Sequence, residues 1–153
     1  MNAFVDFLTN PYFLTAIFAW FLAQILKLII HTIIYKKFDV ARFVGDGGMP
    51  SGHSATVASL ATACGMSFGF GSFEFAVSLV LAIIVCHDAM GVRRETGKQA
   101  ILLNDIVEAF NGLAEEKLPE IKLKEFVGHT PIQVFLGILL GVITAIVMFN
   151  ILF

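Results

Sequence analysis

The sequence predicts an all-α integral membrane protein: a bundle of four transmembrane helices with an additional amphipathic or extended helix between spans three and four. Of the 153 residues, 58% are hydrophobic and only 14% are charged, which is far from the mixture of a soluble globular domain. Several apolar runs are long enough to cross a hydrocarbon core of about 30 Å. At this length we expect a single membrane domain over residues 1–153.

Four apolar segments are expected to span the membrane, with polar loops between them. The spans cover about residues 11–35, 50–71, 72–90 and 132–153, and the polar loops cover 36–49 and 91–131. These two loops follow spans one and three, so a four-span protein carries them on the same side. They hold essentially every Lys and Arg outside the spans. The positive-inside rule therefore places both loops in the cytoplasm.

The loop between spans three and four contains an amphipathic segment. From Ile101 to Leu113 the apolar residues share one helical face, and polar residues such as Asp105 and Glu108 fall largely on the other. This pattern predicts a helix that either lies at the membrane interface or continues span three into water.

The stretch GGMPSGHS, residues 47–54, separates a charged loop from an apolar span and has the features of an active-site loop. Pro50 is expected in the first turn of a helix, because it donates no backbone hydrogen bond and its φ is already helical. Ser51 and Gly52 then leave backbone N–H groups uncovered at the positive end of a helix dipole, which describes an anion site. His53 can donate a proton to an anion held there. Taken alone, the eight residues also fit an ordinary turn before a membrane helix.

Three polar residues of the first span, Gln24, Lys27 and His31, fall on one helical face. A lysine inside the membrane costs about 2.5–3.5 kcal/mol on insertion scales, which makes a functional role the default hypothesis. The alternative is that Lys27 snorkels to the membrane surface. We favour an inward-facing role, because Lys27 shares its face with two other polar side chains.

A second histidine stands just ahead of the last span. Thr130 is expected as the N-cap and Pro131 at the first helical position, so His129 precedes a membrane helix much as His53 begins one. If the spans pack as a bundle, both histidines lie on one membrane face. The cations expected beside them are Lys27, Arg42, Arg93 and Arg94.

Two histidines and several cations around an anion site are the groups that phosphate-ester cleavage requires. One imidazole attacks phosphorus and forms a phosphohistidine, and the other protonates the leaving oxygen. The cations stabilise the charge on the equatorial oxygens. Nothing in the sequence resembles a carboxylate-based magnesium site, so we expect a reaction that uses no metal and no cofactor.

These residues resemble the type 2 phosphatidic acid phosphatases, which are related to the vanadium haloperoxidases, and most closely that family's short, divergent bacterial and plant branch. Three segments carry the resemblance: GGMPSGHSA around His53, HDAMGVRR ending at Arg94, and GHTPIQVFLGILLG from Gly128. Together with the first span they cover most of the chain. The resemblance implies a four-helix core and an integral protein of the bacterial plasma membrane.

The resemblance also implies roles for individual residues. His129 corresponds to the nucleophile and His53 to the general acid for the leaving group. Ser51 and Gly52 correspond to residues that bind phosphate oxygens through a hydroxyl and a backbone N–H. Arg42 matches the arginine upstream of the PSGH motif, although the proline that follows it in the family is missing here.

The family's lysine has no match at its usual spacing. Lys27, Lys36 and Lys37 compete for that role, and we favour Lys27 because of its polar face.

The third motif departs further from the family pattern. Leu123 stands where an arginine is expected, and Arg93 or Arg94 can supply the guanidinium if the intervening segment loops away. Gln133 replaces the aspartate that orients the nucleophilic imidazole. A glutamine oxygen still accepts a hydrogen bond from the ring but does not stabilise imidazolium by charge, and Asp88 is an alternative orienting acid.

The sequence therefore predicts a membrane phosphatase that hydrolyses a lipid phosphate or an isoprenyl diphosphate through a phosphohistidine. The alternative is a non-catalytic membrane protein that binds lipid phosphates or acts as a scaffold, and a transporter is a weaker third hypothesis. The expected partners are the membrane and the lipid phosphate, and no nucleic acid. Small residues along span two fit either packing within the bundle or a homodimer.

Overall fold

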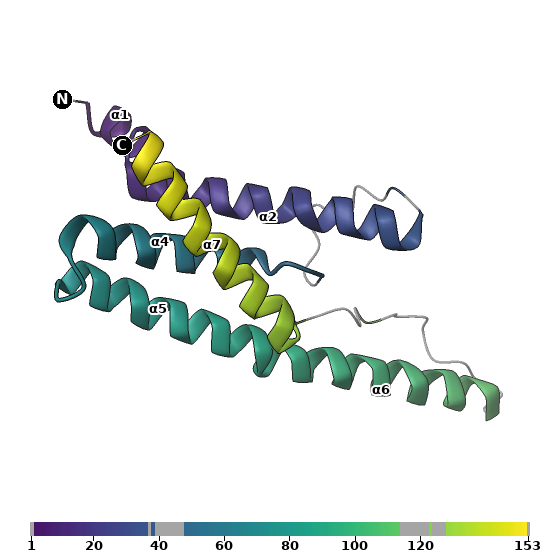
Figure 1. Ribbon diagram of the computed structural model, residues 1–153. Coiled ribbons are helices and arrows are strands. Elements are labelled where there is room, and N and C mark those ends of the chain that lie inside the picture. Colours follow the sequence, from purple (N-terminus) through teal and green to yellow (C-terminus); the bar gives the residue numbers. More distant parts are fainter. Residues whose placement is uncertain (1, 37, 39–47, 114–122, 124–127, 153) are drawn as a thin grey trace.

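The computed structural model describes residues 2–36, 38, 48–113, 123 and 128–152, and these form only helices and their connections (Figure 1). The helices in chain order are α1 (Ala3–Leu8), α2 (Pro11–Tyr35), α4 (Gly52–Phe68), α5 (Phe73–Met90), α6 (Val92–Leu113) and α7 (Pro131–Ile151). The predicted all-α class is confirmed. The six-residue helix α1 was not predicted.

Three helical segments of the described chain are long and apolar enough to cross a membrane: α2, the continuous segment Phe73–Leu113, and α7. The second predicted span corresponds to α4, which has 17 residues. At 1.5 Å per residue it is about 26 Å long. With 17 residues it is shorter than each of the three candidate spans, and its sequence is rich in Ser, Thr, Ala and Gly.

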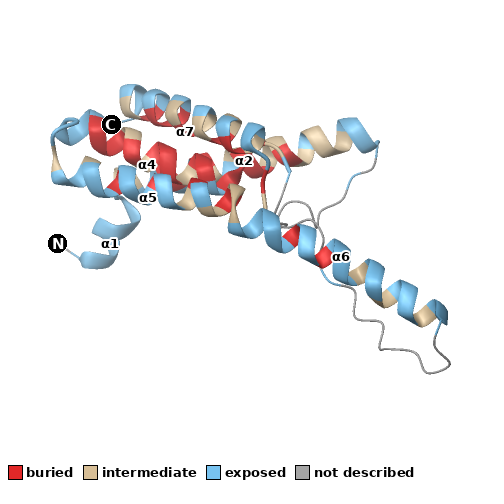
Figure 2. Cartoon of the chain, turned by 90° about the horizontal axis from the view of Figure 1, so that it is seen from below, coloured by how far each residue is buried: buried red, intermediate tan, exposed pale blue. Residues whose placement is uncertain are grey.

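Helix α4 forms the centre of the bundle and packs against α2, α5 and α7. Ten of its 17 residues are buried, compared with four of the 18 residues of α5 (Figure 2). Both chain ends lie at the end of the bundle opposite the start of α4 (Figure 1). The ends of α2 and α5 and the starts of α4 and α7 therefore share the other end, where both histidine motifs fall.

Local capping signals explain where two of the helices begin. Asn10 caps α2, because its side chain accepts hydrogen bonds from the N–H groups of Tyr12 and Phe13. Thr130 is the N-cap of α7 and Pro131 occupies its first position, as predicted.

The start of α4 differs from the prediction. Its N-cap is Ser51 and its first residue is Gly52, so Pro50 precedes the cap and is not in the first turn. The reason is the Ser51 side chain, which accepts a hydrogen bond from the N–H of Ser54 and so caps the helix at its start.

Helix α6 follows α5 after Gly91 and extends away from the bundle (Figures 1 and 2). It begins at Val92, so the polar cluster that precedes the predicted amphipathic segment is helical as well. Apolar side chains such as Leu103, Ile106 and Phe110 are exposed on it. Of the two predicted placements, the structure shows a helix that continues α5.

Helices α4 and α7 approach each other so closely that glycine is required between them. A Cβ at Gly137 would lie 2.5 Å from the carbonyl oxygen of Ser51, and a Cβ at Gly141 would meet the carbonyl oxygen of Ala55. The two glycines are four residues apart and form the small-residue pattern typical of close helix pairs in membranes. The predicted small-residue stripe of α4 is also buried inside the chain.

We predict that Gly141→Ala destabilises the protein by about 1–3 kcal/mol, because the added methyl group forces the two backbones apart. Thermal unfolding in detergent micelles measures the change. Gly112→Ala on α6 is the matched control, since a Cβ there meets nothing within 4 Å. Equal unfolding temperatures for the two variants would contradict the proposed packing constraint.

Candidate active site

The two motif histidines face each other at one end of the bundle. His53 is the second residue of α4, and His129 directly precedes the N-cap of α7. Their ring centroids are 6.2 Å apart and their planes are inclined by 60°. His129 is 3% exposed, whereas His53 is exposed. We call these two residues the histidine pair; a ligand approaching it from outside the bundle meets His53 first.

Backbone contacts with α5 and α6 fix the position of His129. Its N–H donates to the carbonyl oxygen of Ala89 at 2.9 Å. The preceding residue, Gly128, has a φ of +88°, and a Cβ there would lie 2.5 Å from the Cα of Arg94. Only glycine combines this φ with so close an approach. The HDAMGVRR segment thus positions His129 through its backbone.

Gln133, one turn into α7, determines the orientation of the His129 ring. Its Oε1 lies 3.3 Å from His129 Nδ1 and accepts a hydrogen bond from the N–H of Thr130 at 3.0 Å. Because the Thr130 N–H is a donor, the amide atom between the two must be the oxygen, and Nδ1 carries the proton. The unprotonated nitrogen of the His129 ring is then Nε2. Gln133 therefore lies where it can orient the His129 ring.

Ser51, which was predicted to bind phosphate through its hydroxyl, is fully buried as the cap of α4. Its Oγ accepts hydrogen bonds from the N–H of Ser54 at 3.4 Å and from the Ser54 hydroxyl at 3.0 Å. Its own N–H donates to the carbonyl oxygen of Gln133 at 3.0 Å and so joins the starts of α4 and α7. The first-turn N–H groups, beginning with that of Gly52, point out of the helix end.

Lys27 lies beside the start of α4 and is 5% exposed. Its Cγ would be 3.1 Å from a Cβ placed on Gly48, whose φ is +92°. Gly48, three residues before the N-cap of α4, therefore lies against the lysine side chain. Lys36 is exposed at the C-terminal end of α2, and Lys37 lies outside the described residues. Of the two candidate lysines that the structure describes, Lys27 is buried next to Gly48, two residues before the PSGH motif, whereas Lys36 is exposed.

Of the three predicted arginines, the structure describes Arg93 and Arg94, and both are exposed. Arg93 Nε forms an ion pair with Asp88 Oδ2 at 2.7 Å, and both side chains are at least 40% exposed. Asp88 is therefore bound to an arginine and not to a histidine. Arg94 is exposed, and Arg42 lies outside the described residues. Leu123, at the expected arginine position, bonds through its backbone to the Asn104 side chain.

Two residues of α2 at the site were not predicted to belong to it. A Cβ on Gly52 would lie 3.3 Å from Cδ1 of Trp20 and 3.6 Å from Nε2 of Gln24. Gln24 is 5% exposed, and within the described chain its Oε1 is buried without a hydrogen-bond partner. The available signal was the spacing of Trp20, Gln24 and Lys27, which puts all three on one helical face.

The fold and the site together define a class: α-helical integral membrane proteins with a histidine pair at one end of the bundle. Residues 8–144 match the Divergent PAP2 family, and the chain belongs to this family. An uncharacterized membrane protein of Bacillus subtilis (strain 168), YuiD, is 40% identical over 153 residues, covering 94% of this chain and 97% of YuiD. No solved structure matches the chain.

We predict that Lys27→Met weakens the binding of orthovanadate, a phosphate analogue, about 10–100-fold, the loss expected for one charge-assisted hydrogen bond. Calorimetric titration of the purified protein measures the affinity. Lys36→Met, which removes an exposed lysine from the same helix, should leave it unchanged. A larger effect of Lys36→Met than of Lys27→Met would reverse the assignment of the phosphate-binding lysine.

Proposed function

We propose that this protein is a membrane phosphatase that hydrolyses a lipid phosphate or an isoprenyl diphosphate through a phosphohistidine on His129. The observation that carries the proposal is the histidine pair at the N-terminal end of α4, with the buried Lys27 against Gly48, just before that helix. Membership in the Divergent PAP2 family supports it, because the chain carries that family's two histidine motifs in order.

The reaction requires both imidazoles to reach one phosphate group. An attacking atom stands about 3–3.5 Å from its target in a reactive complex. A general acid lies about 2.6–3.2 Å from the oxygen it protonates. With ring centroids 6.2 Å apart, the two imidazoles are close enough to contact one phosphate group.

The reaction proceeds in two steps. His129 Nε2 attacks phosphorus, the bond from phosphorus to the leaving oxygen breaks, and His53 gives its proton to that oxygen. Neutral His53 then takes a proton from water, which attacks the phosphohistidine, breaks the P–N bond and releases inorganic phosphate. Lys27 and the first-turn N–H groups of α4 stabilise the charge on the phosphoryl oxygens in both steps.

We further propose that α4 is a fourth membrane span and that the site faces the cytoplasm. Helix α4 is surrounded by three apolar helices, so its small, weakly polar surface is shielded from lipid. The Lys and Arg residues of the two polar loops favour the cytoplasmic orientation by the positive-inside rule.

The main test is hydrolysis of phosphatidate, phosphatidylglycerophosphate and isoprenyl diphosphates by the purified protein. We expect His129→Ala and His53→Ala each to lower turnover by at least about 10²–10⁴-fold. An ester with an acidic phenol as leaving group should partly rescue His53→Ala, because that leaving group needs no proton, and should not rescue His129→Ala. The controls are His31→Ala and His87→Ala, which change the other two histidines of the chain. Turnover that survived both changes in the histidine pair would overturn the mechanism.

A second candidate function is lipid-phosphate binding without turnover. The ion pair between Arg93 and Asp88 favours it, because it occupies a guanidinium that the reaction was expected to use. Vanadate binding without hydrolysis across the same panel would support this alternative.

We also predict that Gln133→Leu lowers turnover about 10–100-fold, because the His129 ring loses the group that orients it. Gln133 also closes the capping box of α7, so Thr130→Ala is the matched control. Losing the cap costs about 0.5–2 kcal/mol of stability in either variant. Equal turnover in the two variants would show that Gln133 acts only as a cap.

A further inference from the structure

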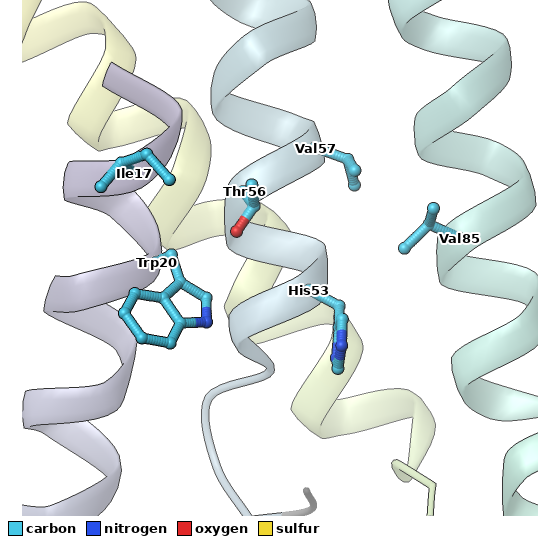
Figure 3. A pocket seen from close by; sticks show the side chains of 6 residues that line it. All are labelled: Ile17, Trp20, His53, Thr56, Val57 and Val85. Atoms are coloured by element: carbon cyan, nitrogen blue, oxygen red, sulfur yellow. The ribbon is translucent and has the colours of Figure 1, made fainter. Parts of the chain in front are cut away.

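An apolar groove leads from the histidine pair along the side of the bundle. It lies between α2, α4 and α5, has a volume of about 420 Å³, and is lined by Ile17, Trp20, His53, Thr56, Val57 and Val85 (Figure 3). We call it the α2/α5 groove. His53 is the one imidazole in its lining, so the groove and the candidate site share a residue.

The groove is open on the side where α2 and α5 would meet lipid. Ile17, on its rim, is 45% exposed. Ile17 lies seven residues before Gln24 on α2, so at 1.5 Å per residue the groove extends about 10 Å from the site along the bundle. It therefore connects the proposed phosphate site with the hydrocarbon region beside it.

Trp20 links the two ends of this path. Its indole lines the groove, and it also lies 3.3 Å from the position that a Cβ of Gly52 would take. The absence of a side chain at Gly52 is what lets the ring reach the start of α4. One aromatic side chain thus contacts both the groove and the first turn of the helix that would hold the phosphate.

An apolar groove does not by itself select a ligand inside a bilayer, because lipid chains are as apolar as its walls. The polar end of the groove, at the candidate site, must therefore select the ligand. Only a lipid whose phosphate reaches Lys27 and the start of α4 gains contacts there that bulk lipid does not make. A second groove, of about 690 Å³ between α4, α5 and α7, is lined by His87 but by neither member of the histidine pair, so it does not lead to the candidate site.

We propose that the α2/α5 groove holds one hydrocarbon chain of the phosphate-bearing lipid, with Trp20 contacting the part of that chain nearest the phosphate. This inference rests on the proposed function, since it assigns the chain of the same substrate. It implies that the substrate enters from the bilayer between α2 and α5, with its ester bond arriving at His53.

The chain provides its own probe, because Trp20 is its only tryptophan. The protein is placed in nanodiscs of phosphatidylcholine containing a small, equal fraction of either phosphatidate or phosphatidylcholine with brominated acyl chains, which quench tryptophan fluorescence on contact. We expect at least twofold stronger quenching by brominated phosphatidate, and we expect orthovanadate to abolish the difference. Equal quenching by the two lipids would overturn the proposal and leave the groove as a site for bulk lipid.

Filling the groove gives the second measurement. Val85→Phe and Ile17→Phe narrow it from α5 and α2 and should each remove at least half of the excess quenching. Leu79→Phe, on α5 but in the second groove, should have no effect. If both groove variants unfold at the wild-type temperature and show the same excess quenching as the wild type, the groove does not hold the lipid chain.

The quenching experiment needs no turnover, so it separates the two proposals. Excess quenching without hydrolysis would support the chain-binding role of the groove and contradict the proposed phosphatase activity. Hydrolysis of phosphatidate without excess quenching would support the phosphatase activity and contradict the chain-binding role. Where both hold, Val85→Phe should raise KM at least fivefold for phosphatidate and leave it unchanged for glycerol 3-phosphate, which has no hydrocarbon chain.

Discussion

The direct contact between the backbones of α4 and α7 is the constraint on which the candidate site depends. Gly137 and Gly141 present no side chains to α4, so its backbone lies against α7 from the first turn onward. The hydrogen bond from the Ser51 N–H to the Gln133 carbonyl oxygen fixes the two helix starts at the same level. Because each histidine belongs to one of these starts, their separation is set by rigid elements and not by side-chain flexibility.

The charges of the site follow from the same packing. The start of α4 carries the positive end of a helix dipole, and the buried Lys27 adds an ammonium group beside it. Interactions between charges are stronger in a weakly polar interior than in water. Arg93, by contrast, is exposed and already paired with Asp88. Anion affinity should therefore depend more on the lysine and the helix end than on these arginines.

The sequence could predict the features whose signals lie within one segment of the chain. The bounds of α2, Pro11–Tyr35, were expected, because apolar length and a proline at the first position are read along one segment. The prediction that Pro50 lies in the first turn of α4 was wrong, because the Ser51 side chain caps the helix one residue later. The contact of Trp20 with Gly52 and the closeness of the histidine rings depend on how separate helices pack, which no single segment encodes.

Gln133 shows how the site can differ from the family pattern and still keep its geometry. His129 is 3% exposed, and an ion pair buried with it would cost desolvation that its attraction does not always repay. A neutral amide accepts the same hydrogen bond and fixes the same tautomer without adding a buried charge. In the proposed mechanism the cost would come after the attack, because a glutamine does not stabilise the positive phosphorylated ring by charge. The negative charge of the transferred phosphoryl group would then have to supply that stabilisation.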